Sequence, residues 1–291
     1  MLFRSACSST PSKVSVSVVA IALNGIGTQT TLPLAGVESF GPDELRVATF
    51  NLYAPGNHSD AIYERWGQEL GAKADVLLLT EVIDQRRAEL VANGARMPHV
   101  VKMQGGDVAI ASRAPIYGFQ SRTIDPPGTL TSNDSHIFSV LSDIGGFPHQ
   151  FIGTHWGIRE ANDVQAPAHL FSPSRLAAAN AILALVPTSA GLVFVGGDFN
   201  AYSGHGPQDH DGDSTTPDFV GFTAEVAALM QRFFDPFVEL NVPNEAHCSN
   251  QRIDYVLGLG QYIPKKYEAC FTQASPSDHP FVLVTFEAGD R

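Results

Sequence analysis

Two polar side chains, Asp198 and Asn200, follow a run of apolar and glycine residues in the segment VFVGGDFNAY, residues 193–202. The run has the composition of a buried strand, so the polar side chains stand where that strand ends. A single Asp or Asn at such a position usually turns or caps the chain. A carboxylate and an amide side by side also have the chemistry to bind a metal ion or a phosphate group.

The same pattern recurs beside other strand-like runs. The further residues are Asn51 after RVATF, Glu81 after DVLLLT, His155 after FIGT, Asp254 before YVL, and Asp278 and His279 before PFVLVTF. A carboxylate in apolar surroundings is unfavourable unless it is paired or bound to a cation. The repetition therefore predicts that the strand ends meet in one cup of oxygen ligands, with histidines at its rim. We call these eight residues the cup.

Such a cup suits a hard divalent cation, because Mg²⁺ prefers carboxylate and amide oxygens and keeps several waters. No group of Cys and His residues in the sequence has the spacing of a structural zinc site. Bound Mg²⁺ polarises a phosphoryl oxygen, and a histidine supported by a carboxylate exchanges a proton near neutral pH. The residue types therefore predict hydrolysis of a phosphate ester.

Alternating strands and helices must position the cup. Strands are predicted at 46–52, 75–82, 193–198, 252–259 and 281–288, and two hairpins at 99–113 and 136–155 around the glycine pairs 105–106 and 145–146. Helices are predicted at 59–74, at 172–186 and around 219–232. Ser59 and Ser172 are the expected N-caps, and Pro187 stops the second helix. This order predicts a layered α/β domain with mixed sheets.

The motifs TFNLY, LLLTEV, GGDFNAY, RIDYVL and SDHPFV occur in the order found in the endonuclease/exonuclease/phosphatase superfamily. From about residue 45 to 288 the chain resembles a member of this group of Mg²⁺-dependent hydrolases, which includes deoxyribonuclease-like nucleases, sphingomyelinases and inositol-polyphosphate phosphatases. The resemblance implies a four-layer α/β sandwich, in which two packed mixed β-sheets are flanked by helices.

The resemblance also implies metal ligands. Asn51, Glu81 and Asp278 match the metal-binding positions, and Glu81 is implied to be the principal ligand. The implied cofactor is Mg²⁺, for which Mn²⁺ can substitute.

Five catalytic positions are implied in the same way, and they are His155, Asp198, Asn200, Asp254 and His279. His155 is implied to contact the phosphate. Asp198 and Asn200 match the motif that orients the attacking water and the phosphate. Asp254 and His279 match a carboxylate–histidine pair.

Three features depart from the superfamily pattern. Thr80 stands where many relatives have Gln, so one expected hydrogen bond is either missing or remade. Trp156 follows the first histidine, and we expect it to pack in the core rather than to stack on a substrate ring. The acidic loop at 203–218 fails the register of an EF-hand, and we expect a solvated loop on the substrate side.

Composition indicates a soluble globular protein: of 291 residues, 44% are hydrophobic and 16% are charged. We predict one domain at 37–291, preceded by a leader at 1–36. The leader contains Arg4 and Lys13, an apolar run at 14–23 and no acidic residue, as in a secretory signal. A disordered tail or an edge strand is the alternative. The expected location is therefore secreted or periplasmic. There, Cys248 and Cys270 are expected to form a disulfide, the alternative being two buried thiols.

The predicted function is metal-assisted hydrolysis of phosphodiester bonds by a nuclease or related phosphodiesterase, acting as a monomer without an obligate protein partner. The net charge of −12 argues against a tight, sequence-tolerant nucleic-acid binder. Few basic residues are expected near the cup: Arg113, Arg159, Arg175 and Arg252. A phosphomonoesterase and a sphingomyelinase-like lipid phosphodiesterase remain alternatives, the latter because of the aromatic segment at 228–240. A non-catalytic binding module is disfavoured, since acids, amides and histidines are all present.

Overall fold

The structure is a computed structural model of the chain. It describes residues 44–53, 58–125, 134–157, 159–160, 164–165, 172–187, 192–202, 223–249, 252–273 and 277–288. The leader predicted at 1–36 and the acidic loop at 203–218 lie outside these residues.

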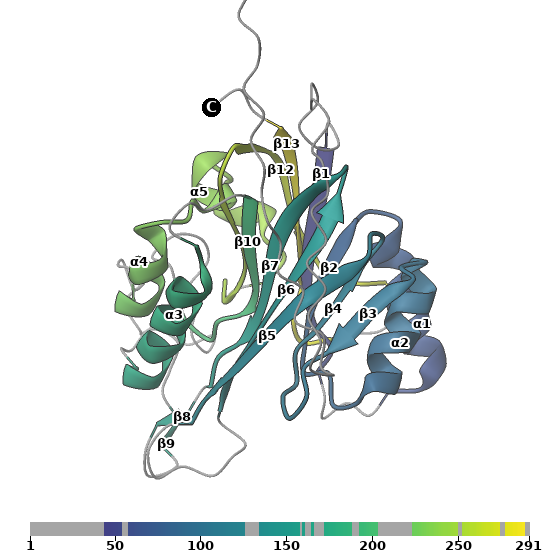
Figure 1. Cartoon of the computed structure of the whole chain (residues 1–291), viewed down its shortest axis with the longest axis horizontal. Helices are drawn as coiled ribbons and strands as arrows, with labels where there is room; N and C mark the ends of the chain where they lie inside the picture. The colour runs from purple at the N-terminus through teal and green to yellow at the C-terminus, as the bar shows by residue number, and fades with distance from the viewer. Residues whose placement is uncertain are drawn as a thin grey trace, which may run out of the picture. The chain divides into compact units, whose positions relative to one another are not determined.

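The first sheet has six strands in the spatial order β12-β13-β1-β2-β4-β3 (Figure 1). Their bounds are Glu44–Asn51 for β1, Val76–Thr80 for β2, His99–Lys102 for β3, Ala109–Ser112 for β4, Tyr262–Cys270 for β12 and Phe281–Ala288 for β13. β1 and β2 are parallel, and the other neighbours are antiparallel. Every residue of β2 is buried, as its uninterrupted apolar run predicts for a strand covered on both faces.

The second sheet has five strands in the order β11-β10-β7-β6-β5. Their bounds are Ile116–Ile124 for β5, Ser135–Ile144 for β6, Phe147–His155 for β7, Leu192–Asp198 for β10 and Asp254–Leu259 for β11. β10 is parallel to β7, and the other pairs are antiparallel. A separate ribbon joins β8 (Arg159–Glu160) to β9 (Val164–Gln165).

Helices cover the outer faces of both sheets (Figure 1). α1 (Asp60–Gly71) and α2 (Gln85–Ala95) share one buried apolar cluster with the six-stranded sheet. α3 (Pro173–Leu185) and α4 (Ala224–Met230) share another with the five-stranded sheet. A third cluster joins the two sheets, with Leu78 and Ile110 on one side and Phe151 and Phe194 on the other. The predicted four-layer sandwich is therefore confirmed.

Local sequence signals explain how the helices begin and end. The Ser172 hydroxyl accepts a hydrogen bond from the Arg175 amide at 3.2 Å, and α3 ends before Pro187 as predicted. Ser59 occupies the N-cap of α1, but its side chain makes no capping hydrogen bond. The helix predicted around 219–232 corresponds, in its described part, to α4.

Among the longer elements, α2, β5 and β12 were not predicted. Helix α2 does carry a start signal, because the Asp84 carboxylate accepts a hydrogen bond from the Arg87 amide at 2.8 Å. A short helix, α5 (Pro236–Glu239), and a 3₁₀ turn at Asn244–Ala246 lead from α4 toward β11.

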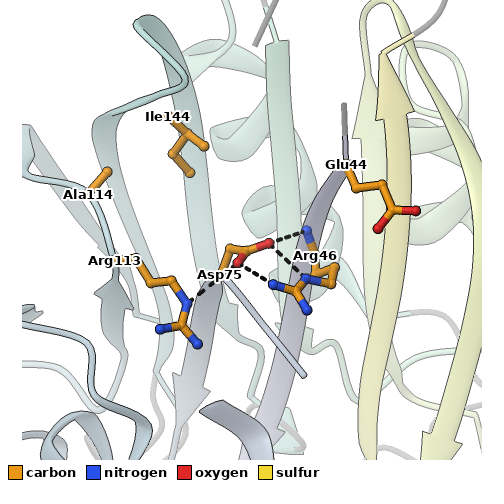
Figure 2. Close-up of a pocket in the computed structure, with 6 residues that line it drawn as sticks. All are labelled: Glu44, Arg46, Asp75, Arg113, Ala114 and Ile144. Carbon is orange, nitrogen blue, oxygen red and sulfur yellow. Dashed lines mark hydrogen bonds and ion pairs between the residues drawn. The ribbon is translucent and has the colours of Figure 1, made fainter. Parts of the chain in front are cut away.

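The cup lies at one edge of the paired sheets, and a different charged cluster lies at the other. Near the start of β1 and β2, Asp75 accepts two hydrogen bonds from the Arg46 guanidinium at 2.8 and 3.0 Å. Nε of Arg113 lies 3.5 Å from the same carboxylate. Figure 2 shows Asp75 between the Arg46 guanidinium and Nε of Arg113. Glu44 and Ile144 also line the cavity at this place, which has a volume of about 420 Å³. We call this group the arginine cluster.

The two cysteines lie close together. The Cys248 thiol donates a hydrogen bond to Sγ of Cys270 at 3.3 Å, and no disulfide joins them. Disulfide formation in an oxidising compartment stays a prediction. Across the described part of the chain, none of the helices is both long and apolar enough to cross a membrane.

Candidate active site

Strand register aligns four polar residues across the five-stranded sheet. His136 on β6 pairs with His155 on β7, which pairs with Asp198 on β10, which pairs with Asp254 on β11. Laterally paired residues point to the same face of a sheet. Two histidines and two carboxylates therefore form one row, which we call the polar row. Three of its members were predicted from the sequence, and His136 was not.

One oxygen atom, Oδ2 of Asp198, is the centre of the site. The Asn51 amide donates a hydrogen bond to it at 3.2 Å. Nε2 of His155 lies 3.7 Å away and Nε2 of His279 lies 3.8 Å away. Asp198 is only 2% exposed, so this charge has almost no contact with solvent. Side chains from both sheets thus converge on a single buried carboxylate.

His279 is held from behind by Asp254. Nδ1 of His279 lies 2.7 Å from Oδ2 of the Asp254 carboxylate, so the ring presents Nε2 to Asp198. Burial lowers the pKa of His279, but the charges of Asp254 and Asp198 outweigh it and raise the pKa to about 10. Burial raises the pKa of Asp254 to about 6 against the opposing effect of His279. Near neutral pH the pair is therefore an ion pair, with a proton on each ring nitrogen.

The segment before β13 is anchored to β1. The Ser277 hydroxyl donates a hydrogen bond to the Asn51 carbonyl at 2.8 Å and accepts one from the His279 amide at 3.1 Å. These bonds fix the backbone of His279 relative to the strand that carries Asn51.

His155 is held by a residue that sequence reasoning missed, Asp107. Nδ1 of His155 lies 2.7 Å from one Asp107 oxygen, and Nδ1 of His136 lies 2.7 Å from the other. Burial lowers the pKa of His155, but Asp107, Asp198 and Glu81 together raise it to about 9. Burial raises the pKa of Asp107, yet the two histidines hold it well below its usual range. Asp107 is thus a charged carboxylate between two imidazoles.

Glu81 follows β2 in a left-handed conformation, with φ of 55°. Non-glycine residues seldom adopt this conformation, which is a feature of functional sites. It brings Oε1 of Glu81 within 3.0 Å of the Asn51 amide nitrogen. The Asn51 side-chain oxygen accepts a hydrogen bond from the Tyr53 amide at 2.8 Å, so here the residue acts as a donor between two carboxylates.

Asn200, like Glu81, has a left-handed backbone conformation, with φ of 46°. Its backbone amide donates to Oδ1 of Asp198 at 2.9 Å, and its side-chain amide donates to the Trp156 carbonyl at 2.7 Å. Gly197 makes the close packing of β10 on β7 feasible, since a Cβ there would lie 1.8 Å from the Thr154 carbonyl oxygen. These contacts fix the direction of the Asp198 carboxylate.

The structure describes two of the three positions that depart from the superfamily pattern, Trp156 and Thr80. Trp156 is fully buried and stacks on Phe199 with ring centroids 4.6 Å apart, so the packing role is confirmed. The Thr80 hydroxyl is buried without a hydrogen-bond partner in the described part of the chain. The side chain at this position therefore does not remake the contact expected of a Gln.

Asp278 stands apart from the other carboxylates. Part of it reaches solvent, and none of the close ligand groups found among the described residues includes it. Partial desolvation and the charges of Glu81 and Asp198 raise its pKa against the effect of His279. It lies at the rim of the cup.

Three of the four arginines expected near the cup pair with acidic residues outside it. Arg113 belongs to the arginine cluster at the opposite edge. Arg175 is fully buried against Glu225, and Arg252 is buried against Asp235. The fourth, Arg159, has no described side chain. Net charge and sequence position did not reveal these ion pairs, because each arginine pairs with an acid remote in the sequence.

The aromatic segment at 228–240 does not supply an apolar surface for lipid. Phe233 and Phe237 are each 3% exposed and pack in the core. Val238 is the large apolar side chain of this segment that reaches solvent.

The donor set fits a divalent cation. Ligand atoms of Glu81, His155 and Asp198 lie within 4.8 Å of one another, as do those of Asp198, Asp254 and His279. The Asp254 and Asp198 carboxylates already have imidazole partners, whereas Glu81 brings a further negative charge next to Asp198. Carboxylates gathered in this way are stabilised by a cation, and oxygen donors suit Mg²⁺ or Mn²⁺.

Comparison with known proteins finds one family model that matches most of the chain. The model of the Endonuclease/Exonuclease/phosphatase family matches residues 48–279. No curated protein matches the chain.

Solved structures share the fold at low identity. An endonuclease/exonuclease/phosphatase from Beutenbergia cavernae is 17% identical with a TM-score of 0.58, covering 85% of this chain and 72% of that one. A family protein from Leptotrichia buccalis is 16% identical with a TM-score of 0.57, covering 84% and 99%. TDP2 from D. rerio, crystallised with a single-strand DNA product, is 16% identical with a TM-score of 0.57, covering 85% and 100%.

Proposed function

Because the chain belongs to the endonuclease/exonuclease/phosphatase family, we propose that it hydrolyses phosphodiester bonds with the help of a divalent metal ion. Membership supports a hydrolase of the phosphoesterase or nuclease type. One observation carries the finer proposal: two carboxylate-held imidazoles and an amide converge on Oδ2 of Asp198. A phosphoryl group seated above this oxygen meets hydrogen-bond donors and a proton acceptor at once.

Asp198 accepts a proton from the attacking water and orients it. Its Oδ1 is occupied by the Asn200 amide, so Oδ2 is the oxygen that faces the substrate. His155 and His279 hold their protons near neutral pH, and each points Nε2 toward this oxygen. Their Nε2–H groups donate to the phosphoryl oxygens as negative charge develops there. Two carboxylates behind the rings keep both imidazoles in that orientation.

Glu81 is the residue that we assign to a metal ion, with Asp278 at the rim as a further carboxylate. When bound, Mg²⁺ or Mn²⁺ supplies charge that polarises the phosphoryl oxygen and stabilises the leaving oxygen. The amide of Asn51 keeps the two inner carboxylates at hydrogen-bond distance from one group. We assign Asn51 this spacing role.

The proposed substrate is a nucleic acid. The DNA product bound to D. rerio TDP2 supports this choice. The burial of Phe233 and Phe237 weakens the lipid alternative. Arg113, Arg175 and Arg252 are paired with acidic residues, so we expect weak binding that depends on the metal and the two imidazoles.

The test is a substrate panel with purified protein. It includes bis-p-nitrophenyl phosphate, p-nitrophenyl phosphate, single-stranded and duplex DNA, RNA and sphingomyelin, each with Mg²⁺, Mn²⁺ or excess EDTA. We expect hydrolysis of the diesters with either metal and none in EDTA. Asp198→Asn is the inactive control, and Arg46→Gln at the arginine cluster is the matched active control. Full activity in EDTA refutes the metal mechanism, and faster cleavage of p-nitrophenyl phosphate favours a phosphomonoesterase.

We also propose that the protein is exported and acts as a monomer. The composition of residues 1–36 supports export. N-terminal sequencing of the protein from its native source tests it, since a start at Met1 contradicts cleavage of a signal.

A further inference from the structure

His136 is the member of the polar row that the proposed mechanism does not use. It lies directly beside His155, because β6 and β7 pair in register at these two residues. Only 13% of its side chain is exposed, so the ring is held within the site rather than on the surface. Its Nδ1 lies 2.7 Å from Oδ1 of Asp107. His136 is therefore packed next to a proposed catalytic group, and its ring is hydrogen-bonded to Asp107.

Asp107 reaches this place from the other sheet. It lies in the turn between β3 and β4, and its carbonyl accepts a hydrogen bond from the Val82 amide at 2.8 Å. Val82 follows Glu81, so the turn is tied to the loop that carries the proposed metal ligand. The carboxylate then crosses to the polar row and bonds both histidines.

We infer that His136 is a positioning residue, which fixes the plane of the Asp107 carboxylate and through it the ring of His155. This inference rests on the proposed function. A carboxylate bonded through one oxygen is free to rotate about its Cβ–Cγ bond. With a histidine on each oxygen, Asp107 has one orientation, and its second oxygen meets Nδ1 of His155 at 2.7 Å. The ring of His155 is then fixed with Nε2 toward Asp198.

The geometry also allows a competing role, in which His136 contacts the substrate itself. Among the described residues, none hydrogen-bonds Nε2 of His136. The two roles predict different kinetics. Loss of a positioning residue lowers kcat, whereas loss of a ground-state substrate contact raises KM.

The experiment compares His136→Phe with His136→Asn. Asn keeps a side-chain N–H close to the position of Nδ1, while Phe keeps the ring shape and removes the donor. With bis-p-nitrophenyl phosphate and Mg²⁺, we expect His136→Phe to lower kcat about tenfold, as for other residues that orient a functional group, with KM changed less than about threefold. His136→Asn is expected to recover most of kcat. His99→Phe is the matched control, because His99 lies on the β3–β4 hairpin that carries Asp107 but outside the site.

A double-mutant cycle with Asp107 tests the route of the effect. Asp107→Asn combined with His136→Phe is expected to be no worse than Asp107→Asn alone, because the two act as a unit. Additive losses, a change confined to KM, or equal losses in the Asn and Phe variants overturn the positioning role.

A readout without catalysis separates this inference from the proposed function. In metal-free protein with ¹⁵N-labelled histidine, the Nδ1–H of His155 is expected to give a far-downfield proton signal, assigned by its loss in His155→Phe. We expect His136→Phe to shift or broaden it and His136→Asn to keep it. If the wild type hydrolyses nothing but the signal responds in this way, the proposed function fails and the positioning role stands. An unchanged signal in His136→Phe overturns the positioning role whatever the activity.

Discussion

Asp75 and Asp107 each lie between two basic side chains, near opposite ends of β2. Asp75 precedes the strand and contacts the guanidinium groups of Arg46 and Arg113. Asp107 is tied by its carbonyl to the residue after Glu81, where the strand has ended, and it contacts two imidazoles. Both carboxylates are partly buried, with 18% and 28% of their side chains exposed. The two ends therefore differ mainly in the chemistry of the partner.

That difference separates a structural cluster from a functional one. A guanidinium keeps its proton at any physiological pH, so the arginine cluster has a fixed charge. An imidazole bonded through Nδ1 still has Nε2 to offer to a substrate. We therefore expect changes at Asp75 to alter stability, and changes around Asp107, Asp254 and Asp198 to alter the chemical step.

The largest contrast is expected for His279→Ala. This change removes one of the two imidazoles facing Asp198, and we expect kcat on bis-p-nitrophenyl phosphate to fall at least about a hundredfold. Asp254→Asn is expected to cost less, because the ring remains and only its orientation and charge weaken. The double variant is expected to be little worse than His279→Ala. Steady-state kinetics of the three variants measures this.

Its counterpart at the other end is Arg46→Ala, which is expected to change kcat less than about twofold. Fully additive losses in the His279 and Asp254 pair would show that Asp254 does not act through His279. A hundredfold loss in Arg46→Ala would remove the distinction between the two ends.

A smaller contrast is expected between Asp107→Asn and Asp75→Asn. The first is expected to lower kcat about tenfold to a hundredfold, since outer partners of functional groups have effects of this size. The second breaks the charge-assisted hydrogen bonds from Arg46 and the ion pair with Arg113, both of them partly exposed, and is expected to lower the unfolding free energy by about 1 to 2 kcal/mol, with kcat unchanged. Urea titrations and kinetics of both variants decide the matter. If Asp107→Asn lowers the unfolding free energy as much as Asp75→Asn does and leaves kcat unchanged, the role of Asp107 is structural.

Much of the fold and most of the candidate site followed from the sequence. The apolar runs and the order of the motifs predicted the sandwich, and the family match confirms the resemblance. Strand ends predicted which polar residues would converge, because parallel neighbours such as β1 and β2 end at the same edge. Nδ1 of His279 lies 2.7 Å from Oδ2 of Asp254, in agreement with the carboxylate–histidine pair that the superfamily motifs imply. The catalytic role of this pair stays a prediction.

The parts that were missed depend on contacts between distant segments. Asp107 follows Gly105 and Gly106, where an acidic residue reads as an ordinary turn residue. Nothing local shows that this turn meets β6 and β7 of the other sheet. The sequence did contain a usable signal for His136. In a hairpin with a two-residue turn at 145–146, residues at equal distances before and after the turn pair with each other. His136 lies nine positions before this turn and His155 lies nine positions after it.

The last contrast concerns pH, because the two ends of β2 differ in how they bind protons. His155 and His279 have pKa values raised from 6.5 to about 9 and about 10 by the acids around them. Each holds its proton to higher pH in the folded protein than in the unfolded chain. Their stabilising contribution is therefore complete below about pH 6.5 and is lost as the pH rises through 9 and 10.

We accordingly expect the unfolding free energy of the metal-free protein to fall by an amount on the order of a few kcal/mol between pH 6.5 and 10. In Asp254→Asn the fall is expected to be smaller, because the carboxylate that raises the pKa of His279 most is gone. In Asp75→Asn the whole profile is expected to be lower by a similar amount at every pH, since arginine does not titrate in this range. Urea titrations of the three proteins at four pH values measure how steeply the unfolding free energy changes with pH. Groups that titrate in the same way in all three proteins do not affect the differences between these slopes. A wild-type slope retained in Asp254→Asn would mean that Asp254 does not hold the proton on His279. A different slope in Asp75→Asn would mean that the arginine cluster is coupled to the histidines of the cup. Asp75 and Asp107 would then no longer have separate structural and functional roles.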